Sequence, residues 1–197
     1  MYLFSKRIFD VVSSLIALVL FSPLIIIISL WIAIDSRGGV FYKQIRVGKN
    51  QKEFGLYKFR SMRPNSDKAG QITVGNDSRV TKVGRFIRKF KIDEVPQLIN
   101  ILKGDMSVVG PRPEVPKYVN MYSAEQLKVL SVLPGLTDYA SIEYLDEQKI
   151  LGAAEDPDKA YIEEVMPAKL KLNLKYISDR GFWLDIKLIF RTLRKIV

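Results

Sequence analysis

The residues best suited to chemistry are two adjacent carboxylates, Asp93 and Glu94, at the start of a predicted helix. Pro96 belongs in the first turn of that helix, because proline lacks the N–H that a later turn needs. Asp93 and Glu94 therefore fall at or beside the N-cap, where unpaired N–H groups and the helix dipole favour negative charge. A phosphate can bind at the same end. Capping is the commoner role of a lone Asp-x-x-Pro sequence. The rest of the chain therefore has to show whether Asp93 only caps the helix or also takes part in chemistry.

The helix behind these carboxylates has an apolar stripe. Val95, Leu98, Ile99 and Leu102 recur at helical spacing and predict one buried face. Gly104 follows the last of them and predicts the end of the helix.

The composition narrows the chemistry that these residues can perform. The chain has 197 residues, enough for one domain with a modest core. Its formal net charge of +10 favours anionic partners, such as phosphorylated ligands or an acidic membrane surface. It contains no Cys and no His, which excludes disulfides, Cys or His metal sites, Cys nucleophiles and Ser-His-Asp triads. Any metal needs oxygen ligands, which favours Mg²⁺, with Mn²⁺ as the alternative.

Several cations are placed where they could bind phosphate. Lys58 and Arg60 share one face of a predicted strand and could grip a diphosphate, although such a face is more often merely solvated. Arg88 lies on a basic amphipathic helix over residues 81–91, within a turn or two of the carboxylates. That helix suits an anionic membrane or an ordinary protein surface.

A further cation, Arg112, stands between Pro111 and Pro113. The two prolines stiffen the backbone on either side of it. A guanidinium held on a stiff turn suits bidentate contact with a phosphate or a carbonyl-bearing base.

Residues 11–34 form an uncharged, strongly apolar segment that is long enough to cross a bilayer core as a straight helix. Ser22-Pro23 lies at its middle and predicts a break in the helix. Basic residues flank it on both sides, which favours placing both ends on the cytoplasmic side. A helix that enters one leaflet and returns satisfies both observations. A kinked helix that crosses the membrane remains open at this point.

The remaining pattern predicts an α/β fold that is mostly helical. Residues 40–47 and 53–60 flank Gly48-Lys49-Asn50 and predict a β-hairpin, and residues 106–110 predict a short strand. Helices are expected over residues 115–133, 159–177 with a bend near Pro167, and 182–197. The last of these suits the membrane interface or the protein's own core. Residues 63–79 and 146–158 are expected to be loops.

Taken in order, several motifs resemble the bacterial sugar transferase family, the small monotopic phosphoglycosyl transferases. The match covers nearly the whole chain. The matching segments are Lys-Arg-Ile-Phe-Asp at residues 6–10 before the apolar Ser-Pro segment, Lys-Phe-Arg-Ser-Met at 58–62, Asn-Asp-Ser-Arg-Val-Thr at 76–81, Asp-Glu-Val-Pro-Gln-Leu at 93–98 and Gly-Asp-Met-Ser-Val-Val-Gly-Pro-Arg-Pro at 104–113.

The resemblance implies a function. It is the transfer of a sugar phosphate from a UDP-sugar to undecaprenyl phosphate, with release of UMP, as the first membrane step of a polysaccharide or glycoconjugate pathway. Asp93 would be the nucleophile and a Mg²⁺ ligand, and Glu94 its acid–base or metal-supporting partner. Arg112, within Pro111-Arg112-Pro113, would hold the nucleotide, while Lys58, Arg60 and Arg88 are further candidates for phosphate contacts.

The resemblance also implies an architecture and a location. Residues 1–37 would form a re-entrant membrane helix broken at Ser22-Pro23, and residues 38–197 a cytosolic catalytic domain with interfacial helices. The protein would sit among membrane lipids on the cytoplasmic face of the bacterial inner membrane. Whether it acts as a monomer or a homodimer is left open.

The loop after Pro134 departs from the family pattern. Many members have Gly-Ile-Thr-Gly-Trp-Ala-Gln-Val where this chain has Gly-Leu-Thr-Asp-Tyr-Ala-Ser-Ile at residues 135–142. The departure leaves the preferred sugar and the role of this loop open.

Three other functions compete with this interpretation. A membrane-anchored scaffold protein would explain the apolar segments but would leave Asp93, Glu94 and Arg112 without a role. Nucleic-acid binding is disfavoured, because Lys and Arg are spread along the chain rather than gathered in one element. A glycosyltransferase that moves the sugar without its phosphate would release UDP instead of UMP.

Overall fold

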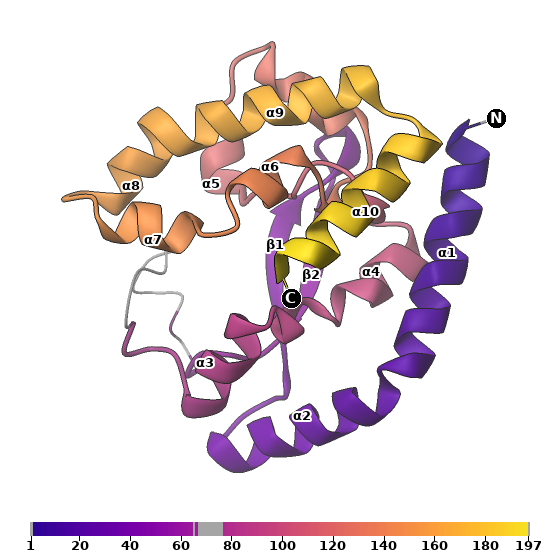
Figure 1. Cartoon of the computed structure of the whole chain (residues 1–197). Helices are drawn as coiled ribbons and strands as arrows, with labels where there is room; N and C mark the ends of the chain where they lie inside the picture. Colours follow the sequence, from indigo (N-terminus) through magenta and orange to yellow (C-terminus); the bar gives the residue numbers. More distant parts are fainter. Residues whose placement is uncertain (1, 65, 67–76, 197) are drawn as a thin grey trace.

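The computed structural model describes residues 2–64, 66 and 77–196 (Figure 1). Two helices, α1 (Tyr2–Leu20) and α2 (Ser22–Asp35), meet at an angle of 61°. Pro23 has no N–H to give to the carbonyl of Val19, and the Ser22 hydroxyl donates a 2.8 Å hydrogen bond to it instead. The predicted break at Ser22-Pro23 is therefore confirmed. Of the described helices, none alone has the length and apolar character to cross a membrane, and only the bent α1–α2 pair meets that test.

Helix α1 is amphipathic, but its buried face is polar and its exposed face is apolar. Its fully buried side chains are the polar Asp10 and Ser14, whereas many of its large apolar residues are exposed. Ala17 and Leu18 are partly buried against the core. The Asp10 carboxylate accepts a 3.0 Å hydrogen bond from the backbone N–H of Val108, and Arg7 donates to the carbonyls of Ile101 and Leu102. Polar contacts thus attach this helix to the rest of the fold.

The predicted hairpin is confirmed. Strand β1 (Phe41–Val47) pairs antiparallel with β2 (Glu53–Phe59), and the 3₁₀ turn η1 (Lys49–Gln51) joins them. Phe59 stacks on Phe41 with ring centroids 5.4 Å apart and is buried between the hairpin and α2. The hairpin thereby carries Lys58 into the centre of the molecule.

The segment that carries the two carboxylates differs in detail from its prediction. Helix α3 (Lys82–Lys89) begins at Thr81, whose hydroxyl accepts from the N–H of Gly84, and the chain then turns at Lys91 in the left-handed region (φ 56°). The 3₁₀ turn η3 (Ile92–Glu94) follows, and helix α4 (Gln97–Lys103) starts only after Pro96 (Figure 1). The carboxylates therefore lie in a separate turn before the helix rather than at its N-cap.

The predicted buried face of this helix was also partly wrong. Leu98 is buried as expected, but Ile99 is 38% exposed, and the polar Gln97 and Asn100 are buried in its place. Asn100 is buried because its side chain donates to the carbonyl of Gly55 and accepts from the N–H of Tyr57, which fastens α4 to β2. The helix ends at Gly104 in the left-handed region, as predicted.

A short parallel pair of strands leads to Arg112. Strand β3 (Ser107–Val109), which was predicted, pairs with β4 (Gly135–Thr137). A Cβ atom on Gly135 would lie 2.1 Å from the backbone nitrogen of Gly110, so the close approach of the two strands requires glycine. The N–H of Gly135 also donates to the carbonyl of Pro111. This hydrogen bond therefore fixes the turn that carries Arg112 to strand β4.

The C-terminal half is divided more finely than the sequence predicts. Its elements are α5 (Pro116–Val119), η4 (Gln126–Ser131), α6 (Tyr139–Glu143), α7 (Glu147–Gly152), α8 (Pro157–Ala160), the π-helical turn η5 (Tyr161–Val165), α9 (Met166–Asp179) and α10 (Phe182–Ile196). The expected bend near Pro167 is present as the π-helical turn, and the expected C-terminal helix is confirmed.

Two predictions in this half were wrong. Residues 115–133 are not one helix, because Ser123 and Gln126 cap each other's backbone N–H groups and start a new turn there. Residues 146–158 are not simply a loop, since they include α7 and the start of α8. Asp156 caps α8 by accepting from the N–H groups of Asp158 and Lys159. Of the predicted loop over residues 63–79, residues 65 and 67–76 lie outside the described residues.

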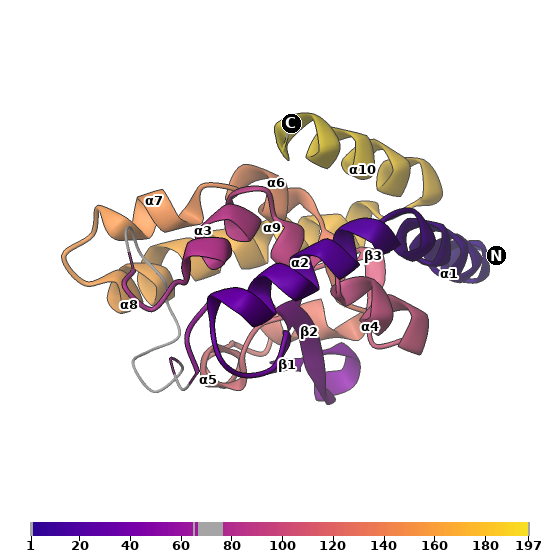
Figure 2. The same cartoon turned by 90° about the horizontal axis from the view of Figure 1, so that it is seen from below.

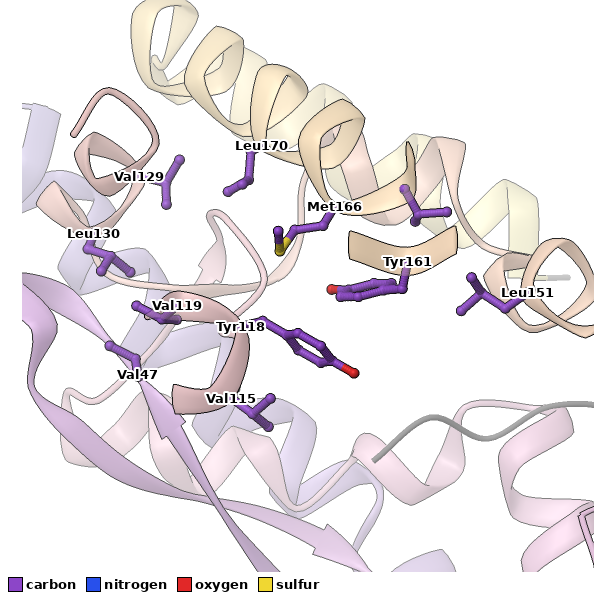
Figure 3. Close-up of a cluster of buried hydrophobic side chains, with 11 residues drawn as sticks. Val47, Val115, Tyr118, Val119, Val129, Leu130, Leu151, Tyr161, Met166 and Leu170 are labelled. Carbon is purple, nitrogen blue, oxygen red and sulfur yellow. The ribbon is translucent and has the colours of Figure 1, made fainter. Parts of the chain in front are cut away.

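The largest cluster of buried apolar side chains lies under α9 and joins the two halves of the chain (Figure 3). Val47 from the hairpin meets Val115 and Tyr118, while Met166 and Leu170 approach from α9. The fold is thus α/β and mostly helical, as predicted, with α9 along the edge opposite α2 (Figures 1 and 2).

Candidate active site

The carboxylates of η3 line a cavity of about 450 Å³. Its walls come from the hairpin, η3, the segment after β3, and helices α6, α7 and α9. A cavity of this volume lies within the usual range of small-molecule sites, roughly 300–1,000 Å³.

Asp93 is buried, with 8% of its surface exposed, and its Oδ1 atom has no hydrogen-bond partner among the described residues. Burial raises the pKa of this carboxyl, and the nearby positive charge of Lys58 opposes the rise. A buried oxygen without a partner costs the protein stability. Because no protein group occupies it, that oxygen is available to a ligand or a reacting atom.

Glu94 stands next to Asp93 but is held by two cations. Arg112 binds it through both terminal nitrogens, with Nη1 3.0 Å from Oε2 and Nη2 on Oε1, and Lys58 Nζ lies 3.4 Å from Oε1. Burial raises the pKa of Glu94, but Arg112 and Lys58 outweigh that effect and lower it far below its usual range. Glu94 is therefore an ionised carboxylate whose lone pairs are already engaged.

Lys58 lies on the floor of the cavity beside both carboxylates. Burial lowers the pKa of its ammonium group, and the charge of Glu94 opposes the fall. Arg88 also lines the cavity. Its positive charge lowers the pKa of Asp93, although less than the charge of Lys58 does. The structure thus brings Lys58, Arg88 and Arg112 together around Asp93 and Glu94.

Arg60 lines the same cavity, but its guanidinium has a structural role. It donates to the backbone carbonyls of Ser36 (2.7 Å) and Arg37 (3.0 Å), beyond the last turn of α2. These contacts tie the end of α2 to the hairpin. A phosphate contact by Arg60 remains a prediction.

The prolines on either side of Arg112 are placed differently. Pro113 lines the main cavity, and its carbonyl accepts from Arg46 Nη1 at 3.0 Å. Pro111 lines a smaller cavity beneath, which it shares with Arg112. Both prolines therefore fix the backbone of Arg112, as expected from their restricted φ.

Other polar residues in the cavity were not singled out from the sequence. Lys91 lies beside the carboxylates, and Glu114 pairs with Arg46 and accepts from the Tyr161 hydroxyl. On the other wall are Ser141, Glu147, Lys169 and Asn173. Two signals were available: Glu114 directly follows Pro-Arg-Pro, and Ser141 lies in the 135–142 loop that departs from the family pattern. Glu147, Lys169 and Asn173 come from segments without a motif.

The described residues contain no cluster of three or more carboxylates that could hold a metal ion by themselves. Asp93 nevertheless offers a hard oxygen ligand with a free lone pair, which fits Mg²⁺ or Mn²⁺. Magnesium in enzymes is commonly held by one or two carboxylates together with substrate phosphates and water. The residues present therefore fit that kind of site.

The cavity thus places a buried carboxylate, one oxygen of which has no partner among the described residues, next to several cations. The chain belongs to the bacterial sugar transferase family, because the family model described as "Bacterial sugar transferase" matches residues 1–197.

Curated relatives agree with this assignment. The chain is 40% identical over 200 residues to a UDP-N-acetylgalactosamine-undecaprenyl-phosphate N-acetylgalactosaminephosphotransferase of Aeromonas hydrophila, covering all of this chain and 44% of the relative. It is 39% identical to a UDP-glucose:undecaprenyl-phosphate glucose-1-phosphate transferase of Klebsiella pneumoniae, covering 96% of this chain and 39% of the relative. It is 36% identical to the uncharacterized sugar transferase EpsL of Bacillus subtilis, covering 98% of this chain and 87% of the relative. The chain thus spans less than half the length of the first two.

Proposed function

We propose that this protein is a phosphoglycosyl transferase, which moves a sugar 1-phosphate from a UDP-sugar to undecaprenyl phosphate and releases UMP. The names of the curated relatives supply the substrates, and the family assignment supplies the reaction class. The observation that carries the proposal is the buried Asp93 Oδ1 without a partner, surrounded by Lys58, Arg88 and Arg112.

In the proposed reaction Asp93 is the nucleophile. Its Oδ1 attacks the phosphorus that carries the sugar, the bond between that phosphorus and the bridging oxygen breaks, and UMP leaves with the electron pair. The phospho-sugar remains on Asp93 as an acyl phosphate. An oxygen of the lipid phosphate then attacks the same phosphorus, forms the polyprenyl diphosphate sugar and releases the Asp93 carboxylate.

The surrounding residues stabilise charge during both steps. Lys58 and Arg88 lie close enough to Asp93 to neutralise the negative charge on the transferring oxygens. Asp93 would also hold Mg²⁺ or Mn²⁺, which would supply Lewis-acid stabilisation of the same oxygens when bound.

Glu94 acts in this proposal mainly by positioning cations. Its carboxylate is ionised and holds Arg112 in a two-point contact, with Lys58 on the same side. Arg112 is thereby fixed at the cavity wall, where it would hold the nucleotide. A separate role of Glu94 in proton transfer remains a prediction.

The N-terminal segment anchors the site to the membrane in this proposal, with residues 1–37 re-entrant and residues 38–197 on the cytoplasmic face. Inverted burial in α1 supports it, since lipid would cover the outward apolar residues. Large apolar side chains are also exposed on other helices. These are Trp31 on α2, Phe86 and Phe90 at α3, and Trp183 and Phe190 on α10.

The chain lacks cysteine, so topology can be measured with single substitutions. Leu3→Cys and Asn50→Cys should both react with a membrane-impermeant thiol reagent from the cytoplasmic side only. Reaction of the two positions from opposite sides would mean that the bent helix pair crosses the membrane.

The decisive test of the reaction omits the lipid acceptor. Purified protein with UDP-sugar and Mg²⁺ alone should exchange labelled UMP into UDP-sugar and carry a phospho-sugar on Asp93, because a covalent mechanism has two separable half-reactions. If the preparation turns over with lipid but shows neither exchange nor adduct, the lipid phosphate attacks directly and Asp93 only binds metal. Release of UDP instead of UMP would show that the sugar moves without its phosphate.

A further inference from the structure

The cavity has a second polar wall, opposite the carboxylates of η3. Ser141 on α6, Glu147 on α7, and Lys169 and Asn173 on α9 line it. Lys169 Nζ lies 2.6 Å from Glu147 Oε2, so these two side chains hold each other in place. The inference below rests on the proposed function and concerns what this wall binds.

Asn173 is the most informative residue on the wall. It is 5% exposed, it lines the cavity, and its Oδ1 atom has no hydrogen-bond partner in the part of the chain that the structure describes. Most buried polar groups are satisfied, so an unpaired side-chain carbonyl costs stability unless a ligand supplies the donor. The group that fits it must carry an O–H or N–H and must reach into the cavity.

Arg112 interacts electrostatically both with this wall and with Asp93. Arg112 and Asn173 both line the main cavity, and both also line a second, much smaller cavity. The negative charges of Glu94, Glu147 and Asp93 all raise the pKa of Arg112. Arg112 therefore stands between the η3 carboxylates and the α7–α9 wall.

The proposed reaction places the sugar of the donor closer to Asp93 than the nucleoside. The phosphorus that Asp93 attacks is bonded through one oxygen to the sugar, whereas the nucleoside lies one phosphate further away. A sugar presents hydroxyl or acetamido donors, and these are recognised by neutral and charged hydrogen-bonding side chains such as those of this wall. The wall offers a carboxamide, a hydroxyl and a held Lys–Glu pair.

We propose that Asn173, supported by Ser141 and the Lys169–Glu147 pair, binds the sugar of the UDP-sugar donor and determines which sugar is accepted. The Asn173 Oδ1 atom accepts a hydrogen bond from a hydroxyl or acetamido group of that sugar. Sugars that place no donor at this point leave the carbonyl unpaired and are used less efficiently.

The test uses the full chain and scores UMP release with undecaprenyl phosphate as acceptor. UDP-glucose, UDP-galactose and their two N-acetylamino counterparts serve as donors. Asn173→Ala and the similarly sized Asn173→Leu both remove the carbonyl acceptor. Each should change the ratio of kcat/KM between the best and the other donors by about tenfold, the factor expected for one hydrogen bond. Asn120→Ala removes an exposed carboxamide outside the cavity and should leave all ratios unchanged.

A second readout separates the sugar from the nucleotide. The inhibition constant of UMP should stay the same in the Asn173 variants, because UMP lacks the sugar. Loss of UMP affinity, or identical donor ratios in an active, folded variant, would overturn the inference. If Asn173→Ala does not fold, Asn173→Leu and Ser141→Ala provide the same comparison. A wild-type protein that releases no UMP from any donor would instead refute the proposed function itself.

Discussion

Two buried aspartates, Asp185 and Asp93, are treated in opposite ways by the fold. Asp185, on α10, is 3% exposed and accepts three hydrogen bonds. Its Oδ2 atom accepts two of them, from the Tyr2 hydroxyl (2.9 Å) and Lys6 Nζ (2.7 Å). Its Oδ1 atom accepts the third, from the Tyr176 hydroxyl (2.8 Å). Asp93 is buried almost as deeply, yet its Oδ1 has no partner.

The difference fits a structural role for Asp185 and the reactive role proposed for Asp93. Asp185 joins α1, α9 and α10, and its charge is fully compensated, as a structural carboxylate requires. Asp93 keeps one oxygen unpaired beside Lys58, at a cost in stability that a functional site tolerates. Substitution of each aspartate should therefore separate activity from stability.

The largest effect is expected for the activity of Asp93→Asn. An amide is a poor nucleophile and a poor Mg²⁺ ligand, so UMP release should fall by at least about 10³-fold. The variant should still fold, and it should carry no phospho-sugar adduct. Asp146→Asn changes a carboxylate that is 70% exposed and should retain full activity. Substantial turnover by Asp93→Asn would remove this residue from the role of nucleophile.

For stability, the largest loss is expected from Asp185→Asn. The substitution leaves the Lys6 ammonium without its counter-charge at a buried site, which should cost roughly 3 kcal/mol. For a chain of this size, that corresponds to a fall in Tm on the order of 10 °C. Asp179→Asn, at an exposed site on α9, is the control. Equal melting temperatures for the two variants would show that the Asp185 contacts contribute little.

Arg112→Lys is expected to reduce activity by about 10- to 100-fold. Lysine keeps the charge but cannot contact both oxygens of Glu94 at once, so the cation is no longer held in place. The KM for the UDP-sugar should carry most of the change. Arg191→Lys, on the exposed side of α10, should have no measurable effect. Unchanged kinetics in Arg112→Lys would place this residue outside the site.

The smallest expected effect is a gain in stability from Asp93→Asn at neutral pH. Burial raises the pKa of Asp93 in the folded state, so the protonated form favours folding. That contribution is complete below the ordinary Asp pKa of about 3.9 and is lost as the pH rises through the folded value. Asparagine resembles the protonated form at every pH. The variant should therefore be more stable than wild type at pH 8 by about 1 kcal/mol, and equally stable below about pH 4.

Thermal denaturation of both proteins across this range measures the difference directly. A variant that is less stable than wild type at pH 8 would mean that the Asp93 carboxylate contributes to the fold, as Asp185 does.

Local features of the chain were predictable from the sequence alone. The break at Pro23, the hairpin and the end of α4 at Gly104 all depend on φ restrictions and on hydrogen bonds within a few residues. The adjacency of Asp93 and Glu94 and the stiff turn at Arg112 likewise follow directly from the order of residues in the sequence. Such features are set by neighbours in sequence, so an amino-acid pattern is enough to identify them.

Only the tertiary structure decided which polar groups are paired. The Asp185 contacts join residues up to 183 positions apart, Arg112 meets Glu94 across 18 positions, and Asn173 reaches the same cavity from α9. Whether a buried oxygen finds a donor depends on how distant elements pack, and no local pattern records that. The sequence by itself therefore identified the carboxylates, whereas the fold determined that Glu94 is engaged and Asp93 is open to react.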